Sequence, residues 1–155
     1  MITIRKANTK DIQTLWIFEK ENRIFDRKVL GKTFKEFFLW DINKQEEQIW
    51  KRTVQKDLKK QNHLFLIAQD KTHVGYTWGY YNKQKQGYIN ELFVKEKARG
   101  RKISSQLMQQ MSDWFKERKV KNISLNVFAA NKHAIKIYKK WGFVAFNIYM
   151  KKKLK

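Results

Sequence analysis

A glycine within a run of basic residues is the feature of this sequence with the clearest chemical meaning. The run KEKARGRK covers residues 95–102, and an amphipathic helical pattern starts at Ile103. A helix N-terminus has backbone N–H groups without intrahelical acceptors and the positive end of the helix dipole, so it binds phosphate. Gly100 allows a tight turn, and the hydroxyls of Ser104 and Ser105 could donate to phosphate oxygens. The segment therefore predicts a phosphate site; the alternative is a solvated basic loop before a helix.

A second segment, residues 131–143, combines a helix start, a helix end and a tyrosine between them. It reads NKHAIKIYKKWGF, in which Asn131 is expected to cap a helix and Gly142 to end it. Tyr138 comes seven residues after Asn131, so the two side chains share nearly one face, two turns apart. Such a tyrosine is either part of a site on that face or an ordinary core residue of an amphipathic helix.

The other side chains that could do chemistry exclude several classes of site and reaction. The chain has no cysteine, which excludes thiolate zinc sites, cysteine nucleophiles and disulfides. His63, His73 and His133 lack ligand spacing and acidic neighbours, so we predict no metal. A Ser–His–Asp mechanism has no nucleophile-elbow motif to support it.

Strand and helix patterns alternate around these segments. Period-two or short apolar runs predict strands at residues 2–6, 63–69, 74–81, 87–94 and 122–128, and a final strand or hairpin at 143–150. The strands at 63–69, 74–81 and 87–94 are expected to form an antiparallel meander. Apolar residues at helical spacing predict helices that begin near Ile12, Thr33, Ile49, Ile103 and Lys132. We therefore expect helices packed on a mixed sheet, which is an α/β (α+β) fold. The sequence contains no internal repeat and no sign of a domain boundary.

The charge of the chain is extreme. Thirty-five Lys and Arg against fourteen Asp and Glu give a net charge of +21, which attracts nucleic acid, phosphorylated cofactors or anionic membranes. The lysines are spread over the whole chain, so this charge is either functional or compositional. The chain has no run near the roughly 18 apolar residues of a membrane span, and its polar N-terminus is not a secretory signal. We therefore expect a cytoplasmic protein.

Taken together, the segments at 91–104 and 131–143 resemble the GNAT superfamily of acetyl-CoA-dependent N-acetyltransferases. ELFVKEKARGRKIS is similar to the family's strand-four-to-helix-three segment, whose signature is R/Q-x-x-G-x-G/A, and NKHAIKIYKKWGF is similar to its helix-four motif. The order of the predicted elements also fits. The resemblance implies a single acetyltransferase-like domain over 1–155, with 151–155 as a lysine-rich tail. It also implies a mixed, mostly antiparallel sheet of about six or seven strands flanked by about four helices.

The resemblance further implies a role for each matching residue. Tyr138 would be the general acid that protonates the departing CoA thiolate. The backbone of strand four would hold the pantetheine arm and polarise the thioester carbonyl, and the next loop would hold the pyrophosphate. The implied acetyl-CoA-binding residues are Leu92, Phe93, Val94, Arg99, Gly100, Arg101, Lys102, Ile103, Ser104, Ser105 and Asn131.

The base that deprotonates the attacking amine has two candidates. Glu91 is the carboxylate in the predicted strand beside the site, and it could take the proton through a water. Some family members carry the working carboxylate one position earlier; here that position is Asn90, which could only orient a water. In a regular strand Ile89, Glu91 and Phe93 would share one face. The alternative for Glu91 is a surface carboxylate that balances nearby lysines.

The sequence departs from the family signature at two positions. Lys102 stands where glycine is usual, and Ser104 stands where glycine or alanine is usual. A lysine adds a side chain where the family's backbone approaches the pyrophosphate. Either Lys102 points away and contributes a charge, or acetyl-CoA binds more weakly.

We therefore expect an N-acetyltransferase that moves acetyl from acetyl-CoA to a primary amine by direct attack in a ternary complex. The alternative is a catalytically weak CoA-binding or RNA-associated module of the same fold. The acceptor would be a small-molecule amine or a protein or peptide amine. The charge disfavours strongly cationic acceptors and favours an anionic target, with RNA or ribosome association as a further partner. We expect no membrane partner, and a monomer or homodimer.

Overall fold

The structure is a computed structural model that describes residues 1–31 and 42–154. These residues form two compact units, one from residues 1–22 and 42–126 and the other from residues 23–31 and 127–154. The predicted helix after Thr33 lies outside the described residues, and the single domain over 1–155 stays a prediction.

The first unit is built on a mixed, mostly antiparallel sheet, as predicted. In the described residues it has five strands in the order β1-β2-β3-β4-β5. β1 to β4 pair antiparallel, and β5 pairs parallel to β4. The strands are β1 (Thr3–Lys6), β2 (His63–Asp70), β3 (Thr72–Tyr81), β4 (Gln86–Val94) and β5 (Asn122–Leu125).

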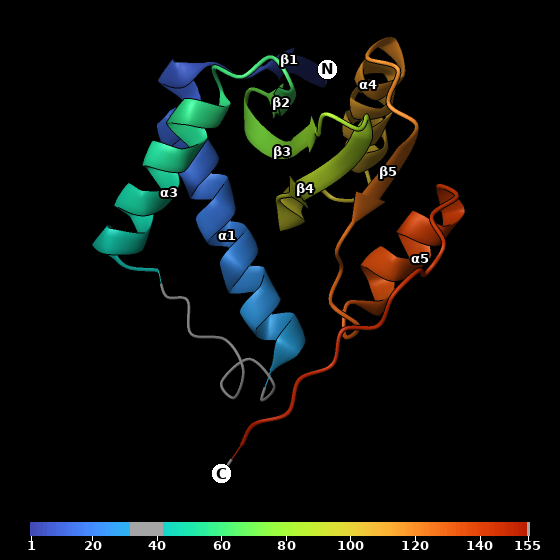
Figure 1. Cartoon of the computed structure of the whole chain (residues 1–155). Helices are drawn as coiled ribbons and strands as arrows, with labels where there is room; N and C mark the ends of the chain where they lie inside the picture. The colour runs from blue at the N-terminus through green and yellow to red at the C-terminus, as the bar shows by residue number, and fades with distance from the viewer. Residues whose placement is uncertain (32–41, 155) are drawn as a thin grey trace. The chain divides into compact units, whose positions relative to one another are not determined.

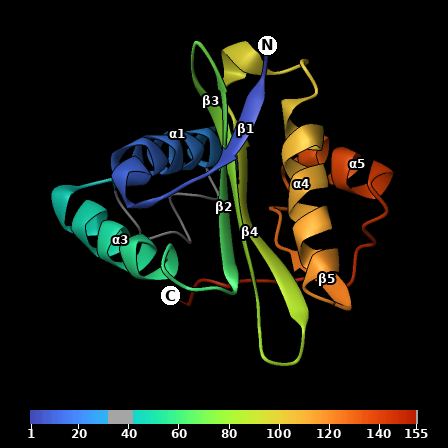
Figure 2. The ribbon, with the colours of Figure 1, turned by 90° about the horizontal axis from the view of Figure 1, so that it is seen from above.

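Helices cover both faces of this sheet. Figure 2 shows the first half of α1 and all of α3 on one face and α4 on the other. Among the described residues the four α-helices are α1 (Ile12–Leu30), α3 (Lys44–Asp57), α4 (Ile103–Glu117) and, in the second unit, α5 (Lys132–Lys140) (Figure 1). Short 3-10 turns, η1 (Thr9–Asp11) and η2 (Glu96–Ala98), precede α1 and α4.

Aromatic rings fill the core between α1 and the sheet. Phe18 of α1 stacks on Tyr76 of β3 with 5.3 Å between ring centroids, and both are buried. The ring centroids of Trp16 and Trp50 lie 5.5 Å apart, and this contact joins α1 to α3. On the other face α4 approaches so closely that a Cβ on Gly79 would lie 2.8 Å from the nearest α4 atom. These contacts place α1 and α4 firmly against β3 and β4.

The predicted strand at the C-terminus is wrong. Residues 143–154 form neither helix nor strand, and β5 ends at Leu125 instead of residue 128. The alternating apolar side chains are present, but Val144, Phe146 and Ile148 are each more than 80% exposed. Alternation shows that a segment suits a strand; the strand itself needs a partner for its backbone N–H and C=O groups. The described sheet therefore has five strands instead of six or seven.

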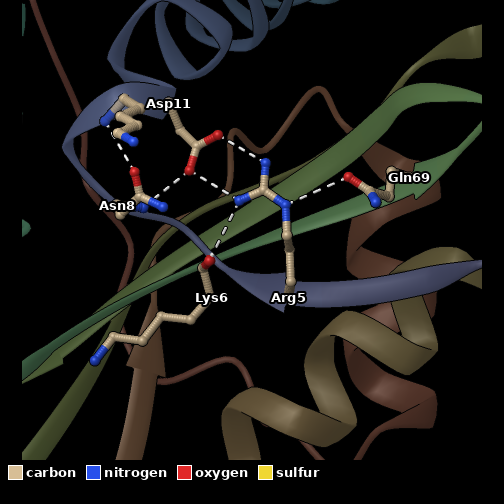
Figure 3. A network of polar contacts seen from close by, with 6 residues as sticks. Arg5, Lys6, Asn8, Asp11 and Gln69 are labelled. Atoms are coloured by element: carbon tan, nitrogen blue, oxygen red, sulfur yellow. Dashed lines mark hydrogen bonds and ion pairs between the residues drawn. The ribbon is translucent and has the colours of Figure 1, made fainter.

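A network of charged and polar groups joins β1 to the start of α1 (Figure 3). The Arg5 guanidinium donates to both carboxylate oxygens of Asp11, at 2.7 and 2.8 Å, and its Nε donates to Gln69 at 3.3 Å. The N–H of Asn8 donates to Asp11, and the N–H of Lys10 donates to the Asn8 side chain. The hydrogen bond from Arg5 is the main reason that the pKa of Asp11 lies below its ordinary value.

Asp11→Asn should lower the free energy of unfolding by about 2 kcal/mol at neutral pH, because it breaks a bidentate charged contact. Since the folded-state pKa of Asp11 is lowered, its contribution is complete above about pH 4 and is lost as the pH falls below that value. Urea unfolding at pH 7 and pH 3 should therefore show a smaller difference between variant and wild type in acid. Asp113→Asn, which removes an exposed pair with Lys116, is the matched control. An equal loss in both variants would contradict the role of the network.

Candidate active site

β4 contains a bulge in its middle. β3 pairs Trp78 with Glu91 and the next residue, Gly79, with Ile89, so Asn90 is an extra residue without a partner on β3. Asn90 is exposed. A bulge of this kind bends the strand and changes which side chains share a face.

The bulge corrects the predicted alternation of β4. Ile89 lies opposite Gly79, and a Cβ on Gly79 would point at Met111, so both residues face α4. Glu91 and Phe93 contact α1 on the other face. The prediction that Ile89 shares a face with Glu91 and Phe93 is therefore wrong, because the extra residue reverses the alternation.

β5 covers only the first half of β4. Their pairing runs from Gln86 opposite Asn122 to Ile89 opposite Leu125. In the part of the chain that the structure describes, no further strand pairs with β4 on this side. Residues 90–94 therefore form an open edge beyond the end of β5.

The open edge presents the backbone groups of Leu92 and Val94. The N–H of Lys95 donates to Val74 of β3 at 2.9 Å. Because the backbone groups of successive residues alternate in direction along a strand, those of Leu92 and Val94 point away from β3. Nε of Arg99 donates to the Val94 carbonyl at 3.1 Å, which fixes the following loop to this edge.

α4 begins without a side-chain cap. α3 and α5 start after Asn43 and Asn131, whose side chains accept backbone N–H groups, whereas Lys102 makes no such bond at the start of α4. The N–H of Gln106 bonds to the Lys102 carbonyl at 3.1 Å and is the first to find an acceptor within the helix. The N–H groups of residues 103–105 lie at the uncapped end, which is the arrangement that binds phosphate.

Two residues of the loop before α4 adopt the left-handed backbone conformation. Gly100 has φ +79° and Lys102 has φ +58°. Glycine adopts this conformation freely, whereas it costs a residue with a Cβ roughly 1–2 kcal/mol. The backbone at Lys102 is thus one that favours glycine, the residue usual in the family signature. A Cβ on Gly100 would point into open space, because no protein atom beyond its two chain neighbours lies within 4 Å.

Arg101 is paired with Asp70, at the turn between β2 and β3. The same carboxylate also accepts a hydrogen bond from the N-terminal amine at 3.3 Å. The hydrogen bond from Arg101 is the main reason that the pKa of Asp70 lies below its ordinary value. A phosphate at the start of α4 would compete with Asp70 for this guanidinium.

In the second unit, Gly142 and Phe143 end α5 and make contacts with Tyr138. Gly142 has φ +87°, and its N–H bonds to Lys139 while the N–H of Phe143 bonds to the Tyr138 carbonyl at 3.0 Å. This is a Schellman motif, which commonly includes a contact between the two apolar residues at its ends. The Phe143 and Trp141 rings pack edge-on against Tyr138, at 5.9 and 5.8 Å between centroids. The ring of Tyr138 therefore has a structural role, and its hydroxyl is the group that could do chemistry.

The predicted site residues divide between the two units. The edge at Leu92–Val94 and the loop at 99–105 lie together in the first unit, joined by the Arg99–Val94 hydrogen bond. Asn131 and Tyr138 belong to the second unit, so their part in the site stays a prediction.

Asn22 is a further candidate site residue that was not predicted from the sequence. Its Nδ2 donates to Oε2 of Glu91 at 2.7 Å. A signal was present, because Asn22 comes four residues after Phe18 and thus continues the apolar face of α1 with a polar side chain.

Within residues 1–31 and 42–154, every helix is too short or too polar to span a membrane. No group of three or more His, Asp or Glu in those residues could hold a metal ion.

A sequence model of the acetyltransferase (GNAT) family matches residues 27–143, well over half of the chain. The chain belongs to the GNAT acetyltransferase family. This GNAT protein is therefore an acetyltransferase enzyme, and acetyl-CoA is the co-substrate that its family membership supports. The open edge of β4 and the uncapped start of α4 fit a molecule with an extended amide arm and a pyrophosphate.

One relative by sequence and two solved structures are similar to this chain. The uncharacterized N-acetyltransferase YdgE of Bacillus subtilis (strain 168) is 28% identical over 115 residues, which are 71% of this chain and 73% of YdgE. A tetramutant of the BH1408 protein from Bacillus halodurans has a similar fold, with TM-score 0.80 and 19% identity over 98% of this chain and 99% of its own. A Clostridium acetobutylicum protein described as a predicted acetyltransferase with acetyl-CoA has TM-score 0.75 and 19% identity, over 99% of this GNAT chain and 96% of its own.

Proposed function

We propose that this enzyme transfers acetyl from acetyl-CoA to a primary amine by direct attack in a ternary complex. The observation that carries the proposal is the open edge of β4 beside the uncapped start of α4, joined by the hydrogen bond from Arg99 to Val94. The pantetheine arm can pair with that edge as an added strand would, while the pyrophosphate accepts from the helix N–H groups.

In the proposed step the amine nitrogen bonds to the acetyl carbonyl carbon, and the carbon–sulfur bond to CoA breaks. Glu91 takes the proton that the amine loses, through a water, and Tyr138 gives a proton to the sulfur. A backbone N–H of β4 donates to the carbonyl oxygen as it becomes negative. In the alternative, Asn90, exposed at the bulge, orients the water, and the amine proton passes through that water to the solvent.

The pyrophosphate contacts are assigned to the loop and the first turn of α4. Backbone N–H groups of Ile103, Ser104 and Ser105 donate to it, and the two serine hydroxyls add donors. Gly100 leaves room for the phosphates, and Lys102 contributes charge from its exposed side chain. Asn131 would add its amide NH2, because its oxygen already accepts the N–H of Ala134.

The acceptor is proposed to be an amine without a high positive charge. The net charge of +21 repels a polycationic acceptor at long range and slows its encounter with the enzyme. Two classes of acceptor fit this proposal: small-molecule amines, and protein or peptide amines.

The function is tested by acetyl-CoA turnover against a panel of small amines, amino acids and peptides, read by the released thiol. We expect thiol release that depends on one class of amine, and thermal stabilisation by both acetyl-CoA and CoA. Stabilisation without turnover on any amine would favour a CoA-binding module over an enzyme of this specificity. No stabilisation at millimolar acetyl-CoA would contradict the co-substrate assignment.

A row of lysines on α5 favours RNA association as a second candidate function. Lys132, Lys136, Lys139 and Lys140 are all exposed on this helix. Their spacing places them on one side of the helix, where their charges can track a phosphate backbone. The lysine-rich tail at 151–155 adds charge in the same unit.

If this surface binds RNA, affinity for a generic single-stranded RNA should fall by about 0.7 log units per log unit of salt for each phosphate contact. Deletion of residues 151–155 should weaken RNA binding and leave the thermal shift with acetyl-CoA unchanged. Filter binding over a salt series measures the slope. Undetectable RNA binding near physiological salt would indicate that the net charge reflects only the amino-acid composition, and RNA would then not be a partner.

A further inference from the structure

We propose that Asn22 of α1 positions the Glu91 carboxylate and favours its ionised form, so that it can accept the proton of the acceptor amine. This inference rests on the proposed function, in which Glu91 is the base. Nδ2 of Asn22 donates to Oε2 of Glu91 at 2.7 Å. An ionised carboxylate can only accept hydrogen bonds, so the Asn22 amide must present its NH2 group, and that contact stabilises the charged form.

Aromatic packing fixes α1 above this part of β4. The Phe18 ring stacks on Tyr76, 9° from parallel, and lies 6.3 Å from the Phe93 ring. Asn22 comes one turn after Phe18 on the helix, and Glu91 comes two residues before Phe93 on the same face of the strand. Four helical residues advance about 6 Å and two strand residues about 6.6 Å. Because these advances nearly match, the ring contacts bring Asn22 over Glu91.

The main chain of Glu91 is held from the other side. Oγ1 of Thr77, a fully buried residue of β3, donates to the Glu91 carbonyl at 2.8 Å. Glu91 follows directly after the bulge at Asn90, where the ladder of hydrogen bonds is disrupted. Thr77 therefore fixes the backbone of Glu91, and Asn22 fixes its side chain.

Two other ionisable side chains of α1 make contacts that can be compared with that of Asn22. On α1, Glu19 accepts from the Tyr76 hydroxyl at 3.1 Å, and Glu21 pairs with Lys95 at 3.5 Å. Asn22 is a neutral donor among them. Its replacement by another neutral residue changes the environment of Glu91 without changing the charge of the site.

The test is a carbon NMR titration of the Glu91 carboxyl in the full chain, together with the pH dependence of turnover on an amine from the panel. Asn22→Leu keeps a similar volume and removes the donor. The Glu91 titration midpoint should rise by about half to one pH unit, since the charged form loses a hydrogen bond. The acid limb of kcat/KM should move up by the same amount, and turnover should fall roughly tenfold. Asn22→Gln, which restores a donor, should move the midpoint and the acid limb part of the way back and should recover part of the lost turnover.

Glu21→Gln is the matched control, because it removes a charged contact from the adjacent residue of α1 and leaves Asn22 in place. It should leave the acid limb where it is in the wild type, and stabilisation by acetyl-CoA should be unchanged in every variant. An unchanged midpoint and acid limb in Asn22→Leu, with Glu91→Gln inactive, would overturn the role of Asn22 and leave the proposed function intact. Full activity of Glu91→Gln would instead overturn Glu91 as the base, and the role of Asn22 with it.

Discussion

Tyr138→Phe should reduce turnover by roughly a hundredfold and leave the affinity for acetyl-CoA near that of the wild type. The substitution keeps the ring that packs against Trp141 and Phe143 at the end of α5, and it removes only the hydroxyl. If that hydroxyl protonates the departing thiolate, chemistry slows while binding and stability stay the same. Steady-state kinetics with the identified acceptor and a thermal shift with acetyl-CoA measure the two effects separately.

Tyr149→Phe provides the matched control, because it makes the same change at an exposed tyrosine in the same unit. It should have wild-type turnover. Tyr138→Ala should lower the melting temperature as well as turnover, since it also removes the apolar contact of the Schellman motif. Wild-type turnover in Tyr138→Phe would leave Tyr138 with its packing role alone.

The parts of the structure that sequence predicted well depend on local signals. Asn131 caps α5, Gly142 ends it with a positive φ, and Gly100 provides a left-handed turn before α4. Each of these residues acts within a few positions of itself, so its type and spacing suffice to predict its effect. The antiparallel meander of β2 to β4 followed in the same way from apolar runs separated by short polar turns.

The missed features depend on contacts between distant parts of the chain. Nothing in the residues around Asn90 distinguishes a bulge from a regular strand, because the bulge exists only in the pairing with β3. The contact of Asn22 with Glu91 joins residues 69 positions apart. The alternation at 143–150 predicted a strand, but alternation does not supply a strand with which to pair. The bulge at Asn90 and the contact between Asn22 and Glu91 therefore could not be predicted from the sequence alone.

Gly100→Asp should abolish the thermal stabilisation by acetyl-CoA. A ligand that binds only the folded state adds about 2.7 kcal/mol at a hundred times its dissociation constant. For a chain of this size that corresponds to a rise of several degrees in melting temperature. Aspartate would place a side chain in the open space beside the loop and bring a negative charge to the proposed pyrophosphate site. Repulsion between the carboxylate and the pyrophosphate should remove the shift.

Backbone strain alone must be separated from this effect, since Gly100 has a positive φ. Gly31→Asp is the matched control: Gly31 has φ +53°, and a Cβ there also meets nothing within 4 Å. It should lower stability by a similar amount and keep the full shift with acetyl-CoA. Lys102→Gly should raise the melting temperature of the free enzyme, because it relieves the left-handed strain at that residue, and should keep the shift. If Gly100→Asp is stabilised by acetyl-CoA as much as Gly31→Asp is, the pyrophosphate does not bind at the start of α4, and the binding site must be sought elsewhere on the enzyme.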